Sequence, residues 1–378
     1  MKSLKILFLI FIFIMGCDSK PIHGNNGMVV STSHQASKVG IDILRQGGNA
    51  VDAASAVGFA LAVTSSSNGN IGGGGFMVGR FTDGKTFTLD YREMAPSKAH
   101  RDVYLDENNN VIEGKSLVSH FASGVPGSVD GLLKAWRDHG SGNISLKQLL
   151  DPAIDLANKG FKLSKYEANR FNRNKDFLSN HPATKQIFTR DDRKWKEGDI
   201  FFQKDLAKTL NRIANKGRDG FYKGKTAKLI AEEMNKVGGW ITLEDLDNYV
   251  SKYRKPIFGS FKGYDIISMG PPSSGGVLLI HMLNMLNELQ TTSELSLDLS
   301  FNLCIKLLAF SKLKYSLFPY EMNPVPNQSP QLSHSFLYVC GGFCGMSFGN
   351  LLESYFLHSV CVLNPVFLAN FLASSKDL

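Results

Sequence analysis

The pattern of hydrophobic and polar residues predicts two helices early in the chain. Apolar residues recur at helical spacing over 33–48, where Ser33 can cap the first turn and a glycine pair can end the helix. The next run, AVDAASAVGFALAV over 50–63, is almost entirely small and apolar. Such a composition is typical of a helix buried on most sides.

A strand pair is predicted next. Residues 72–75 are four consecutive glycines, and they lead into an apolar strand over 76–81. The Asp83-Gly84 pair then predicts a two-residue hairpin turn into a second strand over 85–93. Because glycine has no side chain, such a run lets the backbone lie very close to another backbone or to a ligand.

Regular patterning continues towards residue 290. Thr242 with Asp245 three residues later has the pattern of a capped helix start, which is a structural feature. GYDIISM over 263–269 reads as a strand and GGVLLIHMLNML over 275–286 as a helix.

Residues 291–378 no longer follow a helical or strand period. Leu, Ser and Phe make up 39 of these 88 residues, nine are charged, none is arginine, and four of the five cysteines lie here. The segment is either a separately evolved apolar region or an out-of-frame translation of an A/T-rich gene, and its composition favours the frameshift. Cys340 and Cys344 could nominally hold a metal or form a disulfide, but we assign them no site.

Length, composition and charge limit the number of domains and the kinds of partner that we expect. A chain of 378 residues with 43% hydrophobic and 20% charged residues is typical of one large α/β domain or two ordinary ones. The net charge is +8, yet basic and acidic residues alternate, as in TRDDRKWKEGD, so we expect a solvated face and no nucleic-acid partner. We expect no metal site, because these histidines are scattered without ligand spacing: His34, His100, His120, His139 and His181.

Residues 1–16 predict a bacterial lipoprotein signal peptide. Lys2 and Lys5 precede ten apolar residues, too few to span a bilayer comfortably, and IMGC resembles a lipobox ending at Cys17. Lipidation of Cys17 would anchor the chain stably, because each buried methylene contributes about 0.8 kcal/mol. We therefore expect a lipid on Cys17 and a tether over 17–24. An ordinary signal peptide with an incidental cysteine is the alternative.

This N-terminus predicts an exported protein. The expected location is the periplasmic face of the bacterial inner membrane or the cell surface, with the membrane reached through the lipid. Asp18 follows the cysteine, and aspartate there accompanies inner-membrane retention in some bacterial lipoproteins. With Cys17 lipidated, no other cysteine before residue 291 is left for a disulfide.

Six stretches between residues 25 and 288 carry a family resemblance. They are GGNAVDAASAVGFALAV, GNIGGGGFMV, LDYREMAPSKA, ASGVPGSVDGLLKAW, GGWITLEDLDNY and MGPPSSGGVLLIHMLNML. In order and spacing they resemble the γ-glutamyltranspeptidase (glutathione hydrolase) family of the N-terminal-nucleophile hydrolase superfamily. The resemblance assigns 25–290 to most of the large subunit of such an enzyme.

The resemblance implies an α/β (α+β) fold, a four-layer αββα sandwich whose central sheets share strands from two subunits. Here the sandwich would be incomplete, because only the large-subunit portion is matched. The implied chemistry is γ-glutamyl transfer, in which a threonine freed by self-cleavage attacks the γ-amide of glutathione or a similar compound. The acyl group then passes to water or an amino acid, and backbone donors stabilise the oxyanion. No metal or organic cofactor is implied.

One substrate-binding residue is implied. Arg92, in LDYREMAP, matches the arginine that binds the α-carboxylate of the glutamyl group. A planar guanidinium suits that role because it offers two parallel donors to two oxygens. Without the resemblance, an internal ion pair with Glu93 or Asp90 would be the simpler interpretation.

No catalytic nucleophile is predicted in this chain. The family places it in a T-T-H-x-S-x-x-D motif, which the sequence does not contain. Thr291-Thr292 opens TTSELSLD, but it lacks the histidine and lies too soon after PPSSGG, so we interpret it as a coincidence.

Two functions are therefore expected. One is a γ-glutamyltranspeptidase that cleaves glutathione and other γ-glutamyl compounds. This chain would then lack the small subunit of the enzyme and be inactive alone. The other is a non-catalytic, lipid-anchored remnant or γ-glutamyl-binding partner of a separate small subunit. In either case apolar faces and strand edges would lie uncovered, which predicts an unstable or aggregation-prone chain.

Overall fold

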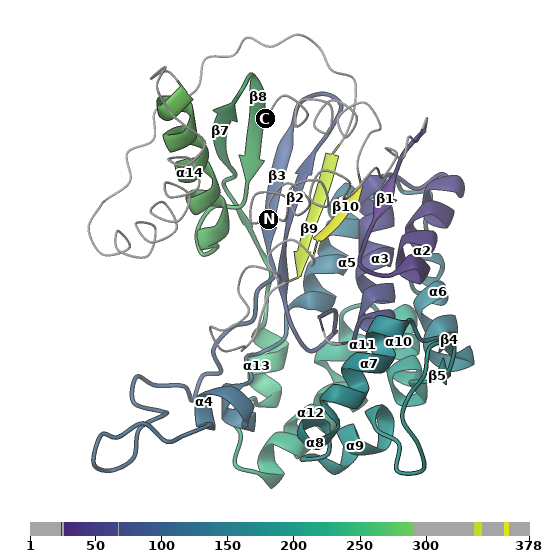
Figure 1. Cartoon of the computed structure of the whole chain (residues 1–378), viewed down its shortest axis with the longest axis vertical. Helices are drawn as coiled ribbons and strands as arrows, with labels where there is room; N and C mark the ends of the chain where they lie inside the picture. The colour runs from purple at the N-terminus through teal and green to yellow at the C-terminus, as the bar shows by residue number, and fades with distance from the viewer. Residues whose placement is uncertain (1–23, 25, 67, 291–335, 342–358, 363–378) are drawn as a thin grey trace, which may run out of the picture.

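The structure is a computed structural model, and it describes residues 24, 26–66, 68–290, 336–341 and 359–362. The predicted signal peptide, Cys17, Thr291-Thr292, Cys344 and most of the predicted tail lie outside the described residues. Figure 1 shows the described part as a sheet in the upper half, with helices along its right side and below it.

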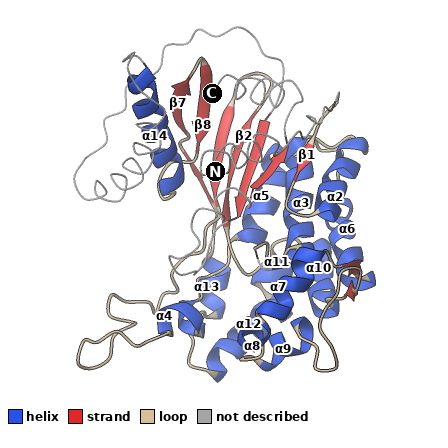
Figure 2. Cartoon of the chain, in the orientation of Figure 1, coloured by secondary structure: helices blue, strands red, loops and turns tan. Residues whose placement is uncertain are grey.

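A six-stranded antiparallel sheet has the strand order β1-β10-β9-β2-β3-β6 (Figure 2). Its strands are β1 (Val29–Val30), β2 (Gly75–Arg80), β3 (Thr86–Asp90), β6 (Lys252–Arg254), β9 (Phe336–Gly341) and β10 (Ser359–Val362). Buried and half-buried residues alternate along β2, so one face of this strand is packed and the other is partly open. Strands β9 and β10 come from the segment after residue 290.

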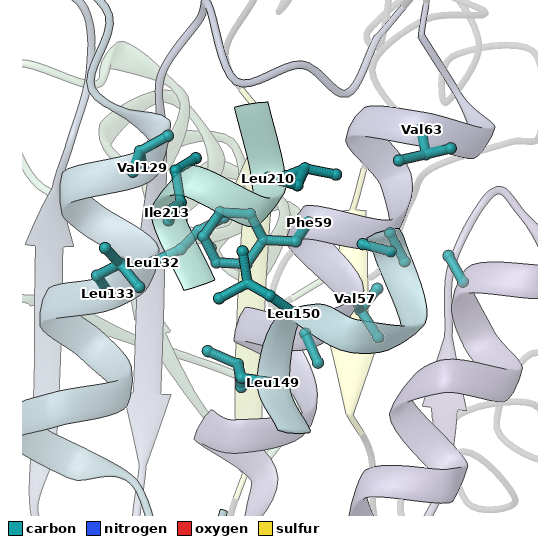
Figure 3. Close-up of a cluster of buried hydrophobic side chains, with 14 of the residues drawn as sticks. Val57, Phe59, Val63, Val129, Leu132, Leu133, Leu149, Leu150, Leu210 and Ile213 are labelled. Carbon is teal, nitrogen blue, oxygen red and sulfur yellow. The ribbon is translucent and has the colours of Figure 1, made fainter. Parts of the chain in front are cut away.

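Helices pack around the buried helix α3 to form the core shown in Figure 3. The main ones are α2 (His34–Arg45), α3 (Ala50–Thr64), α5 (Ser128–His139), α6 (Leu146–Lys159) and α10 (Lys204–Lys216). Twelve of the 15 residues of α3 are buried, which confirms the helix predicted over 50–63. Its many alanines let neighbouring helices approach closely. Phe59 fills the space between them with no exposed surface, and its truncation to alanine would cost about 3–5 kcal/mol.

Two predicted helix starts are confirmed by their capping hydrogen bonds. The Ser33 hydroxyl accepts from the backbone amide of Ala36 at the start of α2. Thr242 and Asp245 form a reciprocal capping box at the start of α13 (Leu243–Asn248). Each cap satisfies amides that the first helical turn leaves without partners.

The predicted two-residue hairpin turn is wrong in length. The amide of Phe81 donates to the carbonyl of Lys85 at 2.8 Å, and the amide of Gly84 donates to the carbonyl of Phe81 at 3.0 Å. Three residues, 82–84, therefore form the loop between β2 and β3. Gly84 has a φ of +85°, the left-handed conformation that closes three-residue hairpins.

Shorter elements complete the described part. They are α4 (Lys115–Val118), η1 (His120–Ala122), α7 (Lys165–Arg173), α8 (Lys175–Leu178), α9 (Pro182–Phe188), α11 (Asp219–Tyr222) and α12 (Gly224–Lys236), with strands β4 (Phe161–Lys162) and β5 (Ile200–Phe201). Of these, α8, α9 and α12 lie lowest in the view of Figure 1. After β6, the hairpin of β7 (Ile257–Phe261) and β8 (Tyr264–Ser268) packs against α14 (Ser274–Gln290). These elements confirm the strand and helix predicted before residue 290. No helix among the described residues is long and apolar enough to cross a membrane.

Candidate functional site

Arg92 lies two residues after the end of β3, and its side chain is exposed. Its guanidinium makes no ion pair or hydrogen bond with the residues that the structure describes. The carboxylate of Asp90 is instead engaged by Arg254, whose Nε and Nη2 lie 3.0 Å and 2.9 Å from Asp90 Oδ2. Glu93 likewise has no ion-pair partner in the described part. The ion pair considered as the simpler role for Arg92 is therefore not formed.

The glycine run holds the backbone around Arg92 in place. Gly75 and Tyr91 exchange backbone hydrogen bonds of 3.2 Å and 3.0 Å. A Cβ atom at Gly74 would lie 2.5 Å from the carbonyl oxygen of Tyr91 and 2.8 Å from the Cα of Arg92. Only glycine fits such an approach, which confirms the close backbone contact predicted for residues 72–75.

A second contact fixes the other side of the same segment. Met94 and Val125 exchange backbone hydrogen bonds of 3.1 Å and 2.7 Å. The amides of Gly127 and Ser128, at the start of α5, both donate to the carbonyl of Gly73, at 2.7 Å and 2.9 Å. The backbone that carries Arg92 is thus held between the glycine run and the segment leading into α5.

Tyr249 reaches this backbone from a distant part of the sequence. Its hydroxyl donates to the carbonyl oxygen of Arg92 at 2.8 Å, and its ring stacks on Tyr222 at 5.7 Å between centroids. Burial raises the pKa of the Tyr249 phenol, so the hydroxyl stays protonated and keeps donating at neutral pH.

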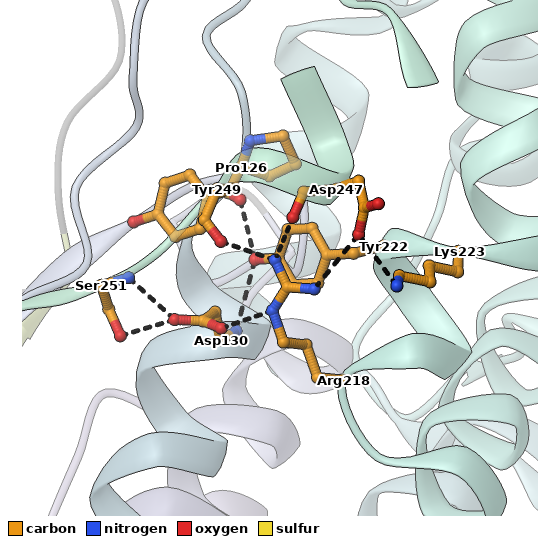
Figure 4. Close-up of polar contacts among 8 residues, drawn as sticks. All are labelled: Pro126, Asp130, Arg218, Tyr222, Lys223, Asp247, Tyr249 and Ser251. Atoms are coloured by element: carbon orange, nitrogen blue, oxygen red, sulfur yellow. Dashed lines mark hydrogen bonds and ion pairs between the residues drawn. The ribbon is translucent and has the colours of Figure 1, made fainter. Parts of the chain in front are cut away.

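A buried carboxylate organises the surroundings of Tyr249 (Figure 4). Asp130, on α5, is 8% exposed and accepts a 2.8 Å hydrogen bond from Arg218 Nε. Its other oxygen accepts from the amide and hydroxyl of Ser251, at 2.8 Å and 2.6 Å. Arg218 also donates to the carbonyl oxygens of Asp247 and Tyr249. Because these contacts bracket Tyr249, they fix the position from which it supports Arg92.

The Arg92 side chain opens onto a cavity of about 410 Å³. Three cationic and two acidic side chains line it. One cation and one carboxylate neutralise each other in the Asp90–Arg254 ion pair. The lining residues are Asp90, Arg92, Glu93, Met94, Tyr249, Val250, Lys252, Arg254 and Pro272. Two cations and one carboxylate of the lining have no ion-pair partner among the described residues, an arrangement suited to a small zwitterionic or anionic ligand. Within the described residues, no group of three or more acidic, histidine or cysteine side chains could hold a metal ion.

Comparison with known protein families shows which family this chain belongs to. A family model described as γ-glutamyltranspeptidase matches residues 36–315, most of the chain. The chain belongs to the γ-glutamyltranspeptidase family. Its mixed helix-and-sheet structure is the α+β fold of the N-terminal-nucleophile hydrolases, as the sequence motifs implied.

Curated relatives of this γ-glutamyltranspeptidase-family chain include glutathione hydrolase proenzymes. The chain is 47% identical over 269 residues to the one from Escherichia coli (strain K12), covering 71% of this chain and 46% of the relative. It is 44% identical over 269 residues to the one from Bacillus subtilis (strain 168), covering 70% of this chain and 45% of the relative. The chain thus spans about half the length of the curated relatives it matches.

Solved structures of γ-glutamyltranspeptidases are also similar to this chain. The γ-glutamyltranspeptidase of Helicobacter pylori matches with a TM-score of 0.68 at 45% identity, over 70% of this chain and 76% of that chain. The γ-glutamyltranspeptidase of Pseudomonas nitroreducens complexed with L-DON matches with a TM-score of 0.70 at 39% identity, over 76% and 85% of the respective chains.

The boundaries proposed within the chain stay predictions. The family match extends beyond Gln290, where we predict the end of the large-subunit-like region, to residue 315. The lipid site at Cys17 lies outside the described residues, so the structure places only Arg92 among the predicted site residues.

Sequence reasoning missed several residues around Arg92. Tyr249 closes the GGWITLEDLDNY stretch, and its place in that motif was an available signal. No comparable sequence signal pointed to Arg254 and Lys252, because their proximity to Asp90 depends on the pairing of β6 with β3.

Proposed function

We propose that the described region supplies the carboxylate-binding part of a γ-glutamyl-transfer site. In this proposal Arg92 binds the α-carboxylate of the glutamyl group of glutathione or a related γ-glutamyl compound. The observation that carries it is the exposed Arg92 guanidinium in the cavity, which has no partner among the described residues because Arg254 takes Asp90. The kinship with glutathione hydrolase proenzymes supports the choice of ligand.

The residues around Arg92 fit the recognition of an amino-acid head group. A guanidinium can donate two parallel hydrogen bonds to a carboxylate. Glu93 lines the same cavity and has no ion-pair partner among the described residues, so its carboxylate can receive the α-ammonium of the same ligand. The clamped backbone at Gly74 fixes the Arg92 backbone, so that only the Arg92 side chain has to be ordered on binding.

We further propose that this chain alone binds γ-glutamyl compounds without cleaving them. The 378 residues contain no T-T-H-x-S-x-x-D motif, and the sources of the threonine nucleophile that we propose are a separate small subunit or another reading frame. Resequencing the gene across the codons for Leu286 to Leu303 separates the two sources. A downstream frame that encodes the motif supports a frameshift, and its absence from every frame supports a separate subunit or a purely binding role.

Membrane attachment is a proposal of its own. The lipobox-like IMGC supports lipidation of Cys17, which would hold the protein at the periplasmic face of the inner membrane or at the cell surface. Growth with radiolabelled palmitate tests this in the native host. Label in the wild-type chain and none in Cys17→Ser supports the anchor, whereas a secreted, unlabelled wild-type chain contradicts it.

Ligand binding tests the role of Arg92. We expect ligand-observed NMR titration of the full chain to show L-glutamate binding that Arg92→Gln weakens more than tenfold, because hydrogen bonds to charged groups contribute about 1.5–3 kcal/mol. Arg80→Gln, which removes a charge of β2 outside the cavity, is the matched control. Equal affinities in the wild type and in Arg92→Gln would contradict the proposal.

A further inference from the structure

The pairing of β6 with β3 places Lys252 on the Arg92 side of the sheet. Lys252 lies directly opposite Asp90, and Arg254 lies opposite Thr88. Opposed residues of an antiparallel pair project from the same face. Tyr253 projects from the other face, where its hydroxyl donates to Asp138 of α5 at 2.9 Å. Lys252 therefore faces away from α5 and lines the same cavity as Arg92.

Because Arg254 pairs with Asp90, Lys252 has no carboxylate partner among the residues that the structure describes. Arg254 contacts Asp90 with two nitrogens, a geometry that a guanidinium achieves and an ammonium does not. The ammonium of Lys252 makes no ion pair with any residue that the structure describes. Arg92 and Lys252 thus give the cavity two free positive charges, against the one free carboxylate of Glu93.

That charge balance exceeds what the glutamyl head group needs. An α-carboxylate and an α-ammonium account for Arg92 and Glu93 and leave one cation over. A γ-glutamyl dipeptide carries one more carboxylate, on the residue joined through the γ-amide, whereas a simple γ-glutamyl amide carries none. The ligand charge that matches Lys252 is that second carboxylate.

We propose that Lys252 is a specificity-determining residue that favours γ-glutamyl dipeptides over neutral γ-glutamyl amides by binding the carboxylate of the residue beyond the γ-linkage. The inference rests on the proposed role of Arg92. The flexible lysine stem lets the ammonium follow carboxylates at somewhat different positions, so selectivity for the charge is expected to be stronger than selectivity for the side chain.

A matched pair of ligands isolates this interaction. γ-Glutamylglycine and γ-glutamylmethylamide have the same glutamyl group and amide, and they differ by one carboxylate. We expect the full-length wild-type chain to bind the glycine compound about two- to fivefold more tightly in NMR titration, the size typical of a solvent-exposed ion pair. The preference should shrink with added salt, because exposed charges are screened.

Variants separate the inference from the proposed function. Lys252→Gln should remove the preference while leaving the affinity for γ-glutamylmethylamide unchanged, and Arg92→Gln should weaken both ligands alike. Lys255→Gln, which removes the same charge just outside the cavity lining, should keep the preference. If both ligands bind and the preference survives in Lys252→Gln, the inference fails alone. If neither ligand binds the wild-type chain, the proposed function fails and the inference with it.

Discussion

The hydroxyl of Tyr249 donates a 2.8 Å hydrogen bond to the backbone carbonyl of Arg92, across 157 positions of sequence. This contact joins the segment before β6 to the segment after β3. It adds a third support to the backbone that carries the guanidinium, beside the glycine run and the segment leading into α5. The position of the anion-binding residue is therefore set by contacts that do not touch its own side chain.

Tyr249→Phe removes this hydrogen bond and keeps the ring that stacks on Tyr222. We expect a loss of about 1 kcal/mol in the free energy of unfolding, the usual contribution of one hydrogen bond. We also expect weaker L-glutamate binding, because the Arg92 backbone loses a support. Urea denaturation and NMR titration measure the two effects.

Tyr253→Phe is the control for that substitution. It also removes one tyrosine hydrogen bond, to Asp138, but on the opposite face of the sheet. It should lower stability similarly and leave L-glutamate binding intact. Equal effects of the two substitutions on binding would refute a positioning role for Tyr249.

Asp130→Asn removes a buried charge and keeps the side-chain shape. Arg218, 29% exposed, would lose its 2.8 Å carboxylate partner and keep only the longer, 4.0 Å ion pair with Asp247, so we expect a destabilisation of about 3 kcal/mol. Asp205→Asn, which breaks an exposed ion pair with Lys208, should change stability by less than about 0.5 kcal/mol. Urea denaturation of both variants tests this, and similar small losses would show that the Asp130 network contributes little.

Two glycines of the run at 72–75 are expected to respond differently to substitution by alanine. Gly74→Ala places a Cβ within 2.5 Å of the Tyr91 carbonyl oxygen, so we expect a loss of about 1–3 kcal/mol and weakened L-glutamate binding. Gly72→Ala meets no atom closer than 3.6 Å and should be close to neutral. Thermal unfolding with the NMR titration distinguishes them. A tolerated Gly74→Ala would mean that close packing does not fix Arg92.

His139 predicts a dependence of stability on pH. Its ring stacks on Phe87 at 4.1 Å, and its Nε2 is buried with no hydrogen-bond partner in the described part of the chain. Burial lowers the pKa of His139 below the ordinary 6.5, against the smaller opposing effect of Asp138. The unfolded chain therefore takes up a proton more readily, and stability falls as the pH drops below about 6.5.

His139→Phe keeps an aromatic ring and removes the titration. Urea denaturation at pH 7.5 and pH 5 should show a smaller loss of stability in this variant than in the wild type. An identical loss in both would assign the pH dependence to other groups.

The sequence predicted local features better than long-range ones. The small apolar run of α3 and the caps at Ser33 and Thr242 were predictable, because their signals lie within a few residues. The β2–β3 loop was predicted one residue too short, because Asp-Gly also suits a three-residue loop that ends on a left-handed glycine.

Around the candidate site, the sequence identified the anion-binding residue but not its setting. Arg92 and the glycine run were recognisable from local motifs. The freedom of Arg92 depends on Arg254 taking Asp90, 164 positions away, and that pairing follows from the strand register. The same register places Lys252 in the cavity, and no local sequence pattern predicts this position.

The most direct test of the account is a crystal structure of the full chain with L-glutamate bound. We predict the α-carboxylate on the Arg92 guanidinium through two parallel hydrogen bonds, with Asp90 still held by Arg254. A ligand bound outside this cavity, or an Arg92 side chain paired with Glu93 while the ligand lies elsewhere, would contradict the central claim.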